Sequence, residues 1–332
     1  MKRGKSTAMD QYVHDLQHAP DWRDREAAAA FLGKLKDDES LHALIAALCG
    51  DSDSDVRISA ARALAERGDP QATESFISAF NNALECGDVA DAEFKEYAQT
   101  LGRLKDKRAI STLIIGLSSE RPEAREIVRD ILLKEVGTDA VSSLIDALDN
   151  PDFRILMGAA SILSRMGYRV TPPLLKALVS PHPSVRMGAA MALGDLKAEE
   201  AVQSLVAALK DEDLQVVQEA AKALGQIGLP SVALLVEGLA DPDFHVRLEA
   251  TRTLGLIDFE EAFKDADWSR TITAAIDGLL PVTTDQDLDI RKEALLSLGT
   301  LGGILSRDGI SHRDHSLALD VLDALTGTLS DE

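Results

Sequence analysis

Apolar residues recur along the chain at spacings of four, three and one, as in the segment 56–64. This spacing places them on one face of an α-helix, which has 3.6 residues per turn. The same pattern returns at 185–194, 246–255 and 290–299, and in weaker form between these copies. The chain is therefore predicted to contain a set of similar amphipathic helices, which we call helices B.

A second amphipathic helix precedes each helix B, and a short polar turn separates the two. Leu41, Leu44 and Leu48 mark one of these preceding helices, and the segment 202–209 contains another. The turns, such as 51–55, are rich in Asp, Ser and Pro. Asp and Ser cap helix N-termini, and Pro resists helix continuation. Each unit is thus predicted to be a helix A, a tight turn and a helix B.

The last leucine of helix B recurs at a nearly constant interval. The steps between successive copies are 32, 37, 31, 31, 30, 31, 30 and 44 residues. Such a period indicates stacked repeats, because one helix pair cannot bury its apolar face alone. We therefore expect an all-α fold, an α-solenoid of about nine helix pairs wound into a right-handed superhelix. The nine positions are Leu32, Leu64, Leu101, Leu132, Leu163, Leu193, Leu224, Leu254 and Leu298.

The irregular steps and the two ends suggest how the chain is divided. We expect an N-terminal capping segment at 1–19 and a repeat array at 20–303 with an insertion near 256–288. Within the insertion, residues 259–268 look like a short helix. A C-terminal amphipathic helix within 304–332 is expected to cap the array. The step of 37 residues predicts an extended helix A followed by a longer turn.

The residues of the turn and helix B carry a family resemblance. The pattern Asp-x-Asp-x-x-Val-Arg-x-x-Ala-Ala-x-Ala-Leu, as at 51–64, resembles the HEAT repeat, in particular its short-period, PBS-lyase-like branch. The resemblance covers about residues 20–300. It implies that helices B line a concave surface and helices A a convex one. Because the family serves many unrelated roles, the resemblance implies the fold far more than the function.

An arginine near the start of helix B invites two interpretations. A row of arginines could bind anions along the array. Alternatively, as repeats of this type imply, each arginine bonds turn carboxylates and carbonyl oxygens of its own or the adjacent repeat; we favour this structural role. Val217 interrupts the row. Its members are Arg25, Arg57, Arg125, Arg186, Arg247 and Arg291.

Charge and cysteine content narrow the class of protein. The formal net charge is -21, so nucleic acid, which requires a basic surface, is not an expected partner. Cys49 and Cys86 are the only cysteines and show no CxxC spacing, which favours a reducing cytoplasm. The basic start, 1–6, precedes no apolar signal segment, and no apolar run approaches the roughly 20 residues that span a bilayer. We expect a cytoplasmic protein without membrane insertion.

Candidate chemistry is sparse. The sequence contains no phosphate-binding loop and no nucleophile elbow. It also contains no His-Glu dipeptide, the iron-binding pair of the HEAT-like deoxyhypusine hydroxylases. The cluster His312-Arg313-Asp314-His315 could bind a metal through its two histidines, but an exposed loop that caps the last helix is the favoured interpretation. We expect no catalytic residue, no metal site and no cofactor.

Methionines suggest where a partner could bind. Four of the six lie within 157–191, and Met187 and Met191 share a helix face. Soft side chains on adjacent helices B suit a peptide-binding groove, although they could equally fill gaps between repeats. If a partner does not bind in such a groove, the segment 259–268 is the alternative binding site.

Chemical variety on helix B points to the same surface. The residues three and six positions after the first apolar residue of helix B differ between repeats. Such variation is expected of recognition residues on a uniform frame. These residues are Ser59 and Arg62, Gly188 and Met191, Glu219 and Lys222, and Glu249 and Arg252. We therefore expect a partner to contact Met157, Met187, Met191, Glu219, Lys222, Glu249 and Arg252.

Three functional hypotheses follow. The first is a non-catalytic scaffold or adaptor that holds a partner protein on the concave helix-B surface. The second, from the family resemblance, is a subunit similar to the phycobilin lyases that acts on tetrapyrrole-bearing proteins; no separate motif for bilin chemistry accompanies it. The third is an adaptor in prokaryotic signalling, such as archaeal taxis, which is a narrower form of the first.

Overall fold

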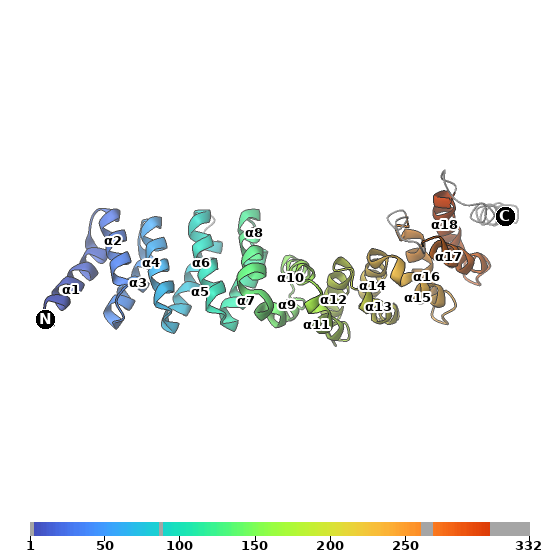
Figure 1. The fold of residues 1–332 in the computed structure, drawn as a ribbon, viewed down its shortest axis with the longest axis horizontal. Helices are drawn as coiled ribbons and strands as arrows, with labels where there is room; N and C mark the ends of the chain where they lie inside the picture. The colour runs from blue at the N-terminus through green and yellow to red at the C-terminus, as the bar shows by residue number, and fades with distance from the viewer. Residues whose placement is uncertain (1–2, 86–88, 260–267, 306–332) are drawn as a thin grey trace. The chain divides into compact units, whose positions relative to one another are not determined.

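The computed structural model describes residues 3–85, 89–259 and 268–305, and every regular element in these ranges is helical (Figure 1). Helices A are α1 (Arg3–His18), α3 (Asp38–Gly50), α5 (Thr73–Glu85), α7 (Lys107–Ile115), α9 (Val141–Ala147), α11 (Thr171–Ala177), α13 (Val202–Ala208), α15 (Val232–Gly238) and α17 (Trp268–Val282). Helices B are α2 (Trp22–Leu32), α4 (Ser54–Arg67), α6 (Asp91–Leu104), α8 (Pro122–Ile131), α10 (Phe153–Arg165), α12 (Pro183–Asp195), α14 (Leu214–Ile227), α16 (Phe244–Leu256) and α18 (Leu288–Leu305). The predicted all-α solenoid is confirmed.

The helices form two compact units, Met1–Ile162 and Leu163–Glu332. Within each unit, helices of one kind pack on their equivalents in the next repeat, so the unit has two layers (Figure 1). In the first unit α2, α4, α6 and α8 form the helix-B layer, and α1, α3, α5, α7 and α9 form the other. In the second unit α12, α14, α16 and α18 form the helix-B layer, over α13, α15 and α17.

The core lies between the two layers. All nine leucines that define the period are at most 1% exposed. The paired alanines of helix B, such as Ala189 and Ala190, are fully buried where neighbouring helices approach. Gly194 allows the closest approach, because a methyl group there would lie 2.6 Å from the Cα of Ala223. Small residues thus set the distance between repeats, and the leucines of the period lie in the core between the layers.

Turn residues end helix A and start helix B as expected. Asp213 accepts hydrogen bonds from the backbone N–H groups of Gln215 and Val216, and so caps α14. Asp243 caps α16 in the same way. These bonds satisfy donors that have no partner inside the helix. The turn aspartates are therefore held in fixed positions, and so are their carboxylate groups.

The step of 37 residues corresponds to the repeat of α5 and α6. Helix A of this repeat, α5, has 13 residues, as many as α3 in the preceding repeat, so the expected extension of helix A is not seen. The expected longer turn falls partly on residues 86–88, which lie outside the described residues. The predicted loop near 282–288 separates α17 from α18. The expected inserted helix falls largely on residues 260–267, and the expected capping helix on residues after Leu305; both lie outside the described residues, as does His312-Arg313-Asp314-His315. No helix in the described ranges is long and apolar enough to cross a membrane.

Candidate partner-binding site

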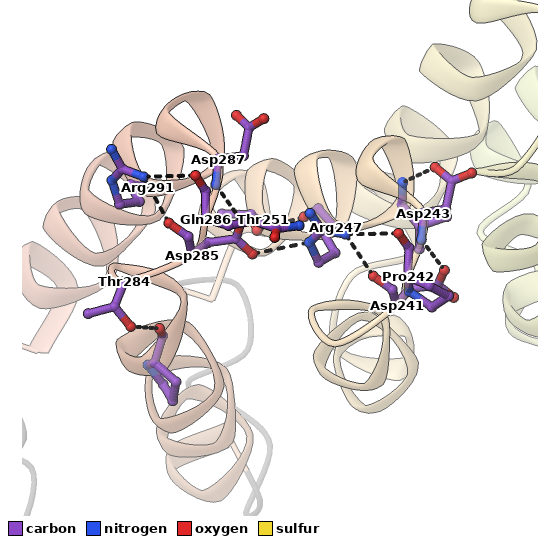
Figure 2. Close-up of polar contacts among 12 residues, drawn as sticks. Asp241, Pro242, Asp243, Arg247, Thr251, Thr284, Asp285, Gln286, Asp287 and Arg291 are labelled. Carbon is purple, nitrogen blue, oxygen red and sulfur yellow. Dashed lines mark hydrogen bonds and ion pairs between the residues drawn. The ribbon is translucent and has the colours of Figure 1, made fainter.

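The arginines of helix B form a ladder through the turns (Figure 2). Nη1 of Arg247 donates to the carbonyl oxygen of Asp241 in its own turn at 3.0 Å, and Nε donates to the carboxylate of Asp285 in the next turn at 3.1 Å. The carbonyl oxygen of Asp285 in turn accepts a bond from Arg291 at 2.9 Å. One aspartate therefore ties two successive arginines together.

The same connection recurs in both units. Asp51 accepts Arg25 through its carboxylate at 2.8 Å and Arg57 through its carbonyl oxygen at 2.7 Å. Arg186 holds Asp211 with two bonds, of 2.7 and 2.6 Å. The structural interpretation of these arginines is thus confirmed. Because their donors are used inside the solenoid, they do not form an anion-binding surface.

Val217 replaces the arginine in one repeat, and a lysine compensates for it. The side chain of Val217 has no hydrogen-bond donor, so it supplies no partner for Asp241, the first residue of the next turn. The Nζ atom of Lys210 lies 2.8 Å from the carboxylate of Asp241 instead. This bond from Lys210 is the main cause of a lowered pKa at Asp241. The row of ion pairs therefore continues through this repeat, although a valine stands in place of its arginine.

The turn aspartates should make stability fall in acid. Burial is the largest single influence on Asp51 and Asp211 and opposes their ionisation. The bonds from Arg25 and Arg186, a backbone N–H bond within each turn and the charges of the arginines together outweigh burial and lower the pKa of each carboxyl below the ordinary 3.8. A carboxyl whose folded-state pKa is lowered stabilises the protein above its unfolded pKa, and this stability is lost as pH falls through the folded-state value.

We expect the urea midpoint to fall as pH is lowered below about 4. Asp211→Asn should reduce that dependence, whereas Glu200→Gln, an exposed control, should leave it unchanged. A midpoint that is equal at pH 5 and at pH 2 would contradict this account of the ladder.

The expected partner-binding residues lie on four helices B and are not equivalent. Met157 lies on α10 in the first unit and is 36% exposed, and Met187 is half-buried on α12. Met191 is buried at 8% exposure on α12, which packs on α14. This burial favours the alternative interpretation, in which Met191 fills a gap between repeats.

Three of the expected residues meet in one groove of the second unit. The groove has a volume of about 780 Å³ and follows the helix-B surface over α12, α14 and α16. Lys222, Glu249 and Arg252 line it. Glu219 lies beside it, 3.3 Å from the ammonium of Lys222. Met157, Met187 and Met191 do not line this groove. The chemically varied positions of helix B thus mark a groove, and the methionines do not.

One arginine serves two carboxylates at the groove. Nη1 of Arg252 lies 2.8 Å from Glu249, and Nη2 lies 3.5 Å from Glu293 on the next helix B. Glu249 is 6% exposed. Its burial is the main cause of a raised pKa, which Arg252 opposes and the charge of Glu293 increases. The described cations at this site therefore neutralise these two carboxylates only in part.

Two exposed leucines were missed by the sequence analysis. Leu256, at the end of α16, is 72% exposed and lines both the groove and a second hollow of about 530 Å³ against α18. Leu296 on α18 is 66% exposed. Leu296 lies six residues after Ile290, the first apolar residue of its helix B, just as Lys222 and Arg252 lie six residues after the first apolar residues of theirs. That register could have identified Leu296, whereas Leu256 lies outside it.

The first unit has a smaller and more polar groove on its helix-B surface. It has a volume of about 600 Å³ and includes Arg62, another position of the same register. Nε of Arg62 lies 2.9 Å from Glu96, which is buried on the next helix B. Arg103, which also lines this groove, lies 3.7 Å from Glu135. The second unit therefore offers the more apolar of these two grooves.

Within the described part of the chain, no three His, Cys, Asp or Glu side chains come together as metal ligands would. The groove of the second unit combines an exposed apolar side chain, charged groups and a buried carboxylate. Such a combination is suited to contact with another macromolecule.

Comparison with known proteins agrees with these repeats. The family model for HEAT repeats matches residues 12–85 and 171–255. A 136-residue stretch, 38% of this chain, is 31% identical to the uncharacterized phycocyanin operon protein Z of Pseudanabaena tenuis (strain PCC 7409) and covers 67% of that protein. This chain belongs to the HEAT-repeat family.

One solved structure shows the same fold over nearly the whole chain. The Pds5 structure determined with Scc1 is similar over 97% of this HEAT-repeat chain, with a TM-score of 0.63 and 13% identity. The alignment spans 60% of that longer chain. An identity of 13% relates the two folds and not their activities. Human deoxyhypusine hydroxylase aligns over 77% of this chain and 98% of its own, with 21% identity and a TM-score of 0.34.

Proposed function

We propose that this HEAT-repeat protein is a non-catalytic scaffold that binds a segment of a partner protein on the helix-B surface of its second unit. The groove over α12, α14 and α16 is the observation that carries the proposal. It gathers side chains from three successive repeats, so a bound segment would contact several of them at once. Repeat arrays typically bind partners through such extended surfaces.

The composition of the groove supports protein as the ligand. Leu256 supplies an exposed apolar contact, and Ala221 and Gly225 leave room beside it. Lys222, Glu249 and Arg252 surround these with charge. An apolar centre with a polar rim is the usual anatomy of a protein interface. The proposal assigns no chemical step to the chain.

The test uses a photo-reactive residue in the groove. p-Benzoylphenylalanine in place of Lys222 should cross-link one specific protein in cells of the native host. The same residue in place of Glu237, exposed on helix A of α15, is the matched control and should not. The cross-linked protein, once purified, should bind the Leu256→Ser variant about tenfold or more weakly, because one well-packed apolar anchor contributes at least this much.

Two results would contradict the proposal. One is cross-linking from position 237 to the same partner with equal yield. The other is a partner whose affinity does not change in the Leu256→Ser variant. Either would place the binding surface elsewhere, and cross-linking from position 157 would then test Met157, which remains an expected contact in the first unit.

A second candidate function rests on the relative named as a phycocyanin operon protein, which is 31% identical over its aligned part. In this alternative the partner carries a linear tetrapyrrole, and the chain resembles a lyase subunit. The visible absorption of the cross-linked partner distinguishes the two candidates. A bilin spectrum would favour the lyase-like function, and a colourless partner would favour the scaffold.

A further inference from the structure

We propose that the groove of the second unit selects an extended segment of the partner in which a Lys or Arg residue precedes or follows a large apolar residue with two residues between them. This inference rests on the proposed function and adds the chemistry of the segment. Glu249 and Glu293 would receive the basic side chain, and Leu256 the apolar one.

The charge of the groove favours a basic side chain. Along α14, α16 and α18, the described ion pairs at the groove join three carboxylates, those of Glu219, Glu249 and Glu293, to two cations, those of Lys222 and Arg252. Three negative charges against two positive charges leave an excess of one negative charge among these described groups. An acidic partner would add to this excess, and like charges at a contact are unfavourable.

The excess is concentrated at one point. Among the described residues, one guanidinium, that of Arg252, lies between Glu249, at 2.8 Å, and Glu293, at 3.5 Å. Glu249 is almost fully buried, and burial together with the charge of Glu293 raises its pKa. A second cation brought in by a partner would complete the pairing of both carboxylates. Charge complementarity of this kind mainly sets the specificity of an interface.

Helix geometry sets the distance to the apolar contact. Glu249, Arg252 and Leu256 are spaced by three and four residues, so they lie along one face of α16. Seven residues of α-helix span about 10 Å at 1.5 Å per residue. An extended chain advances about 3.3 Å per residue, so about three residues cover that distance. The expected motif is therefore a basic residue, two intervening residues and a large apolar residue, in either direction along the chain.

The groove is long enough for such a segment. Its lining on α14 runs from Gln218 to Gln226, and its lining on α16 from Glu249 to Leu256, which is about two turns of each helix. Leu256 also borders the hollow against α18, where Gly299 and Gly303 leave open space. The described residues therefore leave space for a large apolar side chain on both sides of Leu256.

The experiment measures the binding of defined peptides by fluorescence anisotropy. The probe is a fluorescein-labelled Gly/Ser peptide with one central Arg-Ser-Ser-Leu. Comparison peptides carry Glu-Ser-Ser-Leu, Gln-Ser-Ser-Leu, Arg-Ser-Ser-Ser, or Arg and Leu six residues apart. We expect the probe to bind about tenfold more tightly than the Glu, Leu-less and wrongly spaced peptides.

Protein variants locate the contacts. Glu293→Gln should weaken the probe about fivefold but leave the affinity of the Gln-Ser-Ser-Leu peptide unchanged, which is the coupling expected of a direct ion pair. Leu256→Ser should remove the advantage of leucine over serine in the peptide. Glu237→Gln on α15 removes one charge away from the groove and is the matched control. Glu293 is preferred to the buried Glu249 because its substitution is less able to disturb folding, which the helical circular dichroism signal verifies for each variant.

Three outcomes would overturn the inference. These are equal binding of the Arg and Glu peptides, an equal loss in the Glu237→Gln control, and no binding of the probe up to about 1 mM, where the free energy of association is already small. If cross-linking at position 222 still captures a partner, the scaffold function stands and only the proposed motif is wrong. If cross-linking fails as well, both are wrong.

Discussion

Arg57→Met is expected to lower the free energy of unfolding by about 3–5 kcal/mol, because it leaves a buried carboxylate without its cation. Arg57 donates two bonds to Glu93, of 2.6 and 2.8 Å. Glu93 is buried on α6, one repeat away. The hydroxyl of Tyr97 donates a third bond to Glu93 at 2.6 Å, and burial together with this bond raises the pKa of Tyr97 above its ordinary range. In the Arg57→Met variant, the hydroxyl of Tyr97 would be the one of these two partners left to the carboxylate of Glu93.

Urea unfolding measures this loss of stability, and two further variants serve as controls. Arg108→Met removes an exposed arginine that lies 3.4 Å from Glu74, so it should cost at most about 1 kcal/mol. The double variant Arg57→Met with Glu93→Leu removes both charges and should recover much of the stability. If the double variant were as unstable as Arg57→Met, the loss would come from packing and not from the stranded carboxylate of Glu93.

The ladder shows how far repeat spacing predicts structure. A fixed register in sequence becomes a fixed position in space, because each helix B starts at the same point of its turn. Arg186 and Arg247 therefore make the same bond to a turn carbonyl oxygen, 2.9 and 3.0 Å long. The replacement of an arginine by Lys210 near Val217 could not be predicted in this way, since Lys210 belongs to helix A's end and its reach depends on the packing of two repeats.

The binding site was predicted less completely, for a related reason. Helical periodicity tells which residues share a face, but it does not tell how much of that face the next helix covers. Met191 and Lys222 occupy the same register, yet Met191 is buried and Lys222 is exposed. Leu256 was missed because it lies beyond the register, where α16 ends and the chain leaves the helix-B layer. Local packing distances, set by residues such as Gly194, decide these differences.

The exposed leucines that the sequence analysis missed support the proposed scaffold function. An apolar side chain that is 72% exposed is not needed for the core, and a second one, Leu296, lies on the adjacent helix B. Single exposed apolar residues are common on protein surfaces, so Leu256 alone would carry little weight. Its position beside a groove with unbalanced carboxylates is what gives it a functional interpretation.

Leu193→Ala is expected to lower the free energy of unfolding of the second unit by about 2–5 kcal/mol. Leu193 ends the apolar stripe of α12 and is fully buried. Its removal leaves a cavity between the helix layers, and the helices can close it only in part because Gly194 already holds α12 against α14. In a repeat array each unit is stabilised by its neighbours, so the loss should extend to α14 and its partner α13.

Leu256→Ala is the matched control, since it makes the same change at an exposed leucine of the same unit. Substitutions at such surface positions usually change stability by no more than about 0.5 kcal/mol. Hydrogen exchange would show where the effect is felt: amides of α12, α13 and α14 should lose protection in Leu193→Ala, while those of α2 and α4 in the first unit should not. Uniform loss of protection in both units would mean that the chain unfolds as one cooperative body. An unchanged urea midpoint would mean that Leu193 contributes nothing to the core.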